Sequence, residues 1–81
     1  MEMKTIYFVS ICEDELGEVE GFLDDTGNVI DFWSLNDAHW RGEYFDGLME
    51  KLGYLVKYPP RKKMLELIRA LRETVIKEWG L

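Results

Sequence analysis

The stretch Ile11–Asp25 holds the residues best suited to chemistry, because it carries seven carboxylates and no basic side chain. Ca²⁺ and Mg²⁺ bind carboxylate oxygens that converge at fixed offsets, as in the EF-hand loop. The segment EDELGEVEGFLDD does not match that loop, and Glu18 and Glu20 on one strand face make a poor cage. We therefore expect no metal and no cofactor. The acids are explained as solvated turns beside one exposed strand face, or as an electrostatic surface for a partner.

A catalytic centre has little support in the sequence. His39 is the only histidine and Cys12 the only cysteine, so a zinc site would need both together with carboxylates, without a recognisable ligand spacing. No Ser or Cys nucleophile stands beside His39. We therefore expect no catalytic residues and a protein that is not an enzyme. A small enzyme centred on His39 is kept as an alternative.

Cysteine usage and hydropathy predict a cellular compartment. A single free thiol fits a reducing cytosol. The sequence lacks an apolar run near the ~20 residues of a membrane span and lacks a signal segment. We expect a cytoplasmic protein without membrane contact.

Charge is unevenly distributed along the chain. The net charge is −6, yet residues 1–37 hold ten acids and one base, while residues 54–81 hold seven bases and three acids. Such asymmetry predicts complementary faces within the domain or with a partner. The basic run Arg61–Lys63 falls in a predicted first helical turn, where it opposes the helix dipole and would suit a phosphate contact. The acidic total argues against nucleic acid as the main partner.

The elements that must position these residues follow from periodicity and turn chemistry. Residues 4–12, 18–24 and 28–34 read as three strands with short connections, which predicts an antiparallel meander. The first of these strands is apolar on both alternating faces, as in a central or doubly covered strand. Residues 54–58 are extended before Pro59 and Pro60, and whether they form a short fourth strand is left open.

Two helices are predicted. One spans about Asp37–Leu52, between an N-cap at Ser34 or Asn36 and a glycine stop at Gly53. The other follows Pro60 and carries an apolar stripe of Met64, Leu67, Ile68, Leu71, Val75 and Trp79. We expect a single α+β domain over residues 1–81, with both helices packed on one face of the sheet.

If both helices cover one face, the alternate residues of the strands point to solvent on the other. With Ile30 and Phe32 inward, Val29, Asp31 and Trp33 point outward, and Glu18, Glu20 and Phe22 oppose Val19 and Leu23. Aromatic anchors with carboxylates at their rim are typical of protein contact surfaces. We therefore expect a partner-binding surface on this face, made of Glu18, Glu20, Phe22, Asp31 and Trp33.

The segment WRGEYFDGLMEKL (Trp40–Leu52) resembles the ribonuclease-binding helix region of barstar-type inhibitors. The residues that carry the resemblance are Gly42, Phe45, Asp46, Leu48, Glu50 and Leu52. It covers thirteen residues, and Trp40 and Arg41 stand where that family has an aromatic pair. The resemblance implies an acidic helix face, Asp46 and Glu50, that inhibits a basic nuclease.

The favoured hypothesis is a non-enzymatic interaction or inhibitor module. It presents acidic and aromatic surface to a basic protein partner or to its own copy as a homodimer. The alternative is a nucleic-acid-associated regulator that uses Arg61–Lys63.

Overall fold

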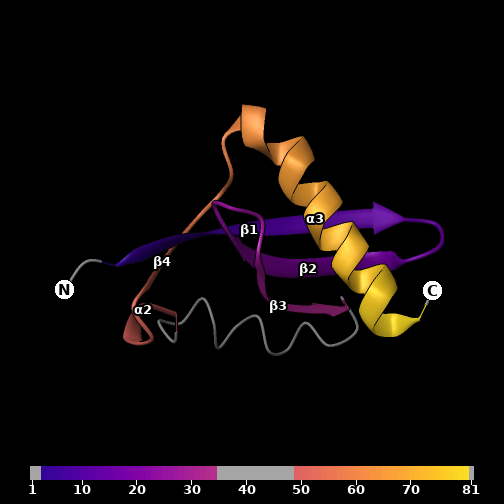
Figure 1. Ribbon diagram of the computed structural model, residues 1–81, viewed down its shortest axis with the longest axis horizontal. Helices are drawn as coiled ribbons and strands as arrows, with labels where there is room; N and C mark the ends of the chain where they lie inside the picture. The colour runs from indigo at the N-terminus through magenta and orange to yellow at the C-terminus, as the bar shows by residue number, and fades with distance from the viewer. Residues whose placement is uncertain (1–2, 35–48, 81) are drawn as a thin grey trace.

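A computed structural model describes residues 3–34 and 49–80 of the chain. In chain order, the elements are β1 (Lys4–Glu13), β2 (Gly17–Asp24), β3 (Val29–Ser34), α2 (Met49–Lys51), β4 (Tyr54–Lys57) and α3 (Arg61–Trp79). The strands form one mixed sheet in the order β3-β2-β1-β4 (Figure 1). The predicted α+β class and the antiparallel meander of β1, β2 and β3 are confirmed.

Both turns of the meander are built by local chemistry. Glu13 pairs with Gly17, so residues 14–16 form the first loop, and Gly17 closes it with φ of 71°. In the second turn, the Asp24 carboxylate accepts hydrogen bonds from the backbone N–H groups of Thr26 and Asn28, both at 2.9 Å. Side chains that bond their own turn in this way fix its conformation.

The segment left open by the sequence is a strand. Tyr54–Lys57 pairs in parallel with β1, from Lys4 opposite Tyr54 to Tyr7 opposite Lys57. Pro59 and Pro60 follow after Tyr58, and proline cannot donate to a strand ladder. β4 is therefore four residues long beside a ten-residue β1.

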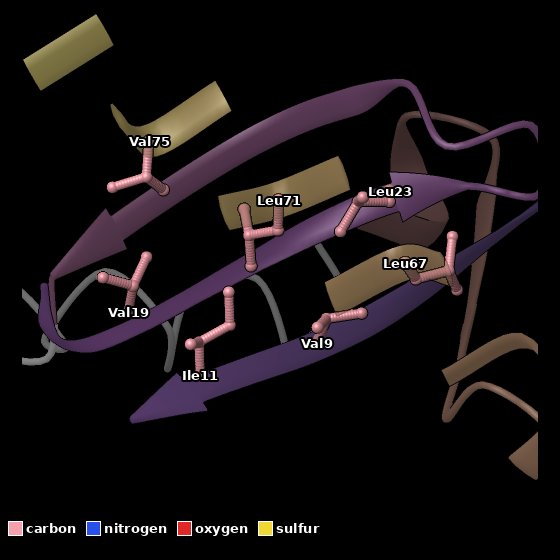
Figure 2. Packing of buried hydrophobic residues seen from close by; sticks show 7 residues of the cluster. All are labelled: Val9, Ile11, Val19, Leu23, Leu67, Leu71 and Val75. Atoms are coloured by element: carbon pink, nitrogen blue, oxygen red, sulfur yellow. The ribbon is translucent and has the colours of Figure 1, made fainter. Parts of the chain in front are cut away.

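One face of the sheet is covered by α3, and we call it the α3 face. Figure 2 shows its buried cluster, in which Leu67, Leu71 and Val75 of α3 lie against Val9, Ile11, Val19 and Leu23. These three helix residues belong to the predicted apolar stripe, so that part of the prediction is confirmed. Trp79, at the end of the stripe, is 41% exposed, and its ring centroid lies 5.6 Å from that of Phe32.

The opposite face of the sheet has a second buried cluster, formed by Ile6, Phe22, Trp33 and Met49. Met49 lies in α2, so α2 and α3 contribute to different faces, and the described residues do not show two helices on the same face. Residues 35–48, which hold most of the predicted helix Asp37–Leu52, lie outside the described part. Burial of side chains on both faces fits the doubly apolar pattern of β1.

A β-bulge changes the predicted pattern of β3. Phe22 pairs with Asp31, but Leu23 pairs with Val29, so Ile30 is the extra residue between them. Val29 therefore joins Phe32 beside the α3 cluster, and Ile30 is 40% exposed. The prediction that Ile30 points inward and that Val29 shares a face with Trp33 was wrong.

Candidate protein-interaction site

The predicted solvent-exposed surface is largely buried. Phe22 is fully buried, Glu20 is 4% exposed and Trp33 is 6% exposed. The expectation that these three side chains face solvent was wrong, because the face opposite α3 is covered as well. A partner cannot reach them without displacing the residues packed on them.

These buried residues form an aromatic core that includes a polar contact. The Trp33 indole Nε1 donates a hydrogen bond to Glu20 Oε1 at 3.1 Å. The Phe22 ring lies edge-on to Trp33, with centroids 5.4 Å apart, and tilted against Phe8 at 5.9 Å. Buried Trp and Glu side chains need such partners. A role in stabilising the fold therefore accounts for these residues.

The remaining predicted partner-binding residues do not gather at one place. Glu18 is exposed, and its Oε1 lies 4.0 Å from the Cys12 thiol. Asp31 is half-buried, and its carboxylate accepts a hydrogen bond from the backbone N–H of Phe32 at 2.9 Å. Glu50 is exposed in α2. Asp46, His39 and most of the barstar-like segment lie outside the described residues.

Several acids of the stretch Ile11–Asp25 have structural partners within the chain. Both Glu13 carboxylate oxygens lie 3.0 Å from the Arg72 Nε, and this contact ties the end of β1 to α3. Partial burial raises the pKa of the Asp24 carboxyl, but hydrogen bonds from Thr26 and Asn28 outweigh this effect and hold the pKa below its ordinary value of 3.8. Within residues 3–34 and 49–80, no three His, Cys, Asp or Glu side chains are grouped so that they could hold a metal ion.

The second half of β1 has an open edge, and the sequence did not reveal it. The Lys4 N–H donates to Gly53 O at 2.9 Å, so the backbone groups of even-numbered β1 residues point toward the β4 side. β4 ends opposite Tyr7. Beyond that point, Ser10 and Cys12 point their N–H and C=O groups away from β2, where the described part of the chain supplies no further strand (Figure 1). We call Phe8–Cys12 the open edge.

Oppositely charged groups flank the open edge. At its C-terminal end, the β1–β2 loop exposes Asp14 and Glu15. At its N-terminal end, Lys57 is exposed at the close of β4, and Arg61 and Lys62 are exposed at the start of α3. The edge is therefore negative at one end and positive at the other.

An exposed aromatic ring also lies near the β4 end of the open edge. Tyr58 is 77% exposed, and its ring stands edge-on to Phe8 at 6.1 Å between centroids.

Lys63 differs from the other basic residues of its run. Its Nζ lies 5.9 Å from the centroid of the Tyr7 ring and donates to the Asp25 carbonyl oxygen at 3.4 Å. Lys63 thus holds the start of α3 to the sheet, which leaves Arg61 and Lys62 to face solvent. The N-cap residue Pro60 provides no side-chain hydrogen bond to the helix.

Comparisons of the chain with protein-family models, with curated proteins and with solved structures find no match. Across the described segments, no helix combines the length and apolar character needed to cross a bilayer.

Proposed function

We propose that this protein is a non-enzymatic protein-interaction module that binds an extended segment of a partner along the open edge. The observation that carries the proposal is the mismatch between a ten-residue β1 and a four-residue β4. An unpaired strand edge is a template for an added strand, which is a common mode of peptide recognition.

The open edge supplies hydrogen-bonding groups to an added strand. Ser10 and Cys12 each offer one backbone donor and one acceptor on the side away from β2. Both residues are exposed and have small side chains. A partner backbone could therefore approach to the usual strand spacing without moving a large side chain.

β4 and the open edge lie on the same side of the sheet, but they differ in how well they are protected against pairing with another strand. Protein edges are usually blunted by short strands, Lys or Pro. β4 has all three features, since it is short, carries Lys57 and is followed by Pro59 and Pro60. The open edge has neither Lys nor Pro between Phe8 and Cys12. This contrast supports a use for the edge in binding.

The charged flanks would orient the bound segment. Asp14 and Glu15 would attract a basic residue at one end, while Lys57, Arg61 and Lys62 would attract an acidic residue at the other. The sequence predicted a basic partner, and in this proposal the basic part of the partner contacts only the β1–β2 loop. It moves the contact from the buried Phe22 and Trp33 to the edge of β1. In a reducing cytoplasm, Cys12 would stay a thiol within this edge.

The test uses a displayed library of random peptides, selected on the immobilised protein. Peptides that bind wild type are expected to lose about tenfold or more in affinity for Ser10→Pro, which removes an outward N–H. They should bind Ser10→Ala as they bind wild type, because only the side chain differs. Circular dichroism checks the fold, and Cys12→Pro repeats the test at the second outward N–H.

Two results would contradict this proposal. One is a selection that yields no binder although the immobilised protein is monomeric. The other is binding that survives both proline variants while they remain folded.

A second candidate, a nucleic-acid-associated regulator, is favoured by the exposure of Arg61 and Lys62 near the exposed Tyr58 ring. Basic and aromatic groups together suit single strands. The net charge of −6 makes us expect weak, salt-sensitive binding. Fluorescence polarisation with labelled oligonucleotides would promote this candidate if sub-micromolar binding were seen and then lost on Arg61→Ala with Lys62→Ala.

A further inference from the structure

We propose that the occupant of the open edge is a second copy of this chain. The two β1 strands would pair antiparallel about a two-fold axis, with Ser10 of each copy opposite Cys12 of the other. This inference rests on the proposed function, because it names the partner that the same edge takes.

The pairing follows from the direction of the backbone groups. Ser10 and Cys12 both point their N–H and C=O groups outward, and in an antiparallel pair such residues face each other and exchange both hydrogen bonds. Ser10 opposite Cys12 therefore uses the outward groups of both residues in both copies. Ile11 then lies on the axis, with its side chain in the α3-face cluster.

The end of β4 limits the register. Lys57 already occupies the position beside Tyr7, so a second copy has room only from about Phe8 onward. With Ser10 opposite Cys12, Val9 faces Glu13, and the β1–β2 loop of the second copy reaches the end of β4. If the second copy were shifted further toward the N-terminus of β1, its Glu13 would fall on the position beside Tyr7 that Lys57 already occupies.

Charge complementarity favours a second copy over a strand of unrelated sequence. The open edge runs from positive, at Lys57, Arg61 and Lys62, to negative, at Asp14 and Glu15. Antiparallel pairing reverses one copy, so the acidic loop of each meets the basic end of the other. An interface of this kind is self-complementary, as a two-fold dimer requires. The remaining charges repel only weakly, because salt screens exposed charges beyond roughly 8 Å.

The first experiment tests the register by disulfide formation. The double variant Ser10→Cys/Cys12→Ser is mixed with wild type under mild oxidation. A disulfide-linked heterodimer should form, because the thiol introduced at position 10 of one copy then faces Cys12 of the other. Each protein alone should form far less covalent dimer. In such a homodimer the thiol of one copy faces a serine of the other, and the other copy's thiol lies two residues further along the strand. Equal cross-linking in all three samples would overturn the proposed register.

The second experiment tests the charges by sedimentation of the full chain. Asp14→Lys/Glu15→Lys and Lys57→Glu/Arg61→Glu should each weaken self-association by about tenfold or more. A mixture of these two variants should associate again, because both ends are then complementary. The control is Glu73→Lys/Lys77→Glu on α3, which exchanges two exposed charges away from the edge and should sediment as wild type does.

The outcomes separate this inference from the proposed function. A wild type that stays monomeric at every concentration, without cross-links, overturns the second-copy inference. If the selected peptides still depend on the Ser10 N–H, the interaction function stands with another occupant. A dimer unaffected by Ser10→Pro and by both charge variants places the interface elsewhere and also overturns the inference.

Discussion

Trp33 and Glu20 lie opposite each other on β3 and β2, and the Trp33 indole N–H donates to the buried Glu20 carboxylate at 3.1 Å. A charged group in a covered sheet face is costly unless its oxygens are bonded. The contact therefore holds a carboxylate inside the same cluster that buries Phe22.

Trp33→Phe keeps an aromatic ring but removes the donor to Glu20. We expect the free energy of unfolding to fall by about 1–3 kcal/mol, because a buried acceptor loses a partner. Urea denaturation followed by circular dichroism measures the change. Trp79→Phe, at a 41% exposed position, is the control and should change stability by no more than about 0.5 kcal/mol. Equal effects at the two positions would show that the indole contact contributes nothing.

Asp24→Ala removes the carboxylate that organises the β2–β3 turn. At neutral pH, we expect a loss of unfolding free energy on the order of 1 kcal/mol. The folded-state pKa of Asp24 lies below 3.8, so its stabilisation is complete above the unfolded-state pKa and is lost as the pH falls through the folded-state pKa. The difference from wild type should therefore shrink in acid. Urea denaturation over a pH series measures it, and a difference from wild type that stays constant down to acid pH would contradict this expectation.

Gly21→Ala tests how closely α3 and β3 approach β2. A Cβ at Gly21 would lie 2.9 Å from the Asp31 carbonyl oxygen and 3.0 Å from both Leu71 Cδ1 and Phe32 Cβ. We expect a loss of about 1–3 kcal/mol from overpacking, seen as a lower midpoint of thermal unfolding. Glu18→Ala on the same strand points to solvent and should have little effect. An unchanged midpoint for Gly21→Ala would mean that α3 and β3 both leave more room at Gly21 than these distances indicate.

Amide hydrogen exchange tests the open edge directly. Val9 and Ile11 point their N–H groups toward β2, whereas Ser10 and Cys12 point theirs away from it. At low protein concentration, we expect the Ser10 and Cys12 amides to exchange about tenfold or more faster than those of Val9 and Ile11. Heteronuclear NMR resolves the four signals. Uniform protection along β1 at low concentration would show that the edge is already covered within one chain.

Sequence patterns predicted the meander and the buried face of α3. Alternating apolar residues in a strand, and apolar residues spaced three or four apart in a helix, depend only on local geometry. They did not show which sheet faces are covered. Ile6 is fully buried and Val9 is 1% exposed, and they lie on opposite faces of β1. The apolar pattern of this strand had indicated that it is covered on both faces. The sequence interpretation instead treated Glu20 and Phe22 as one exposed face, because a charged residue in alternation usually marks solvent.

The open edge and the bulge could not be predicted because each depends on pairing between segments. Nothing local to Tyr54–Lys57 indicates that it lies parallel to β1 or where along β1 it stops. The extra residue at Ile30 similarly depends on the register of β3 against Phe22 and Leu23. Registers arise from tertiary packing, whereas Pro59 and Pro60 only indicated that an extended segment ends there.

The parallel pairing of β4 also sets an order of events during folding. It joins Lys4 to Tyr54, which are far apart in the sequence, whereas the two hairpins of the meander join segments separated by short turns. Closing a long loop costs entropy before its contacts form, so we expect the meander to assemble first and β4 to dock late. Until then, the outer edge of β1 is unpaired along the whole strand, because its even-numbered residues have no partner strand for their outward N–H and C=O groups. This interval is when newly made chains are most prone to aggregate.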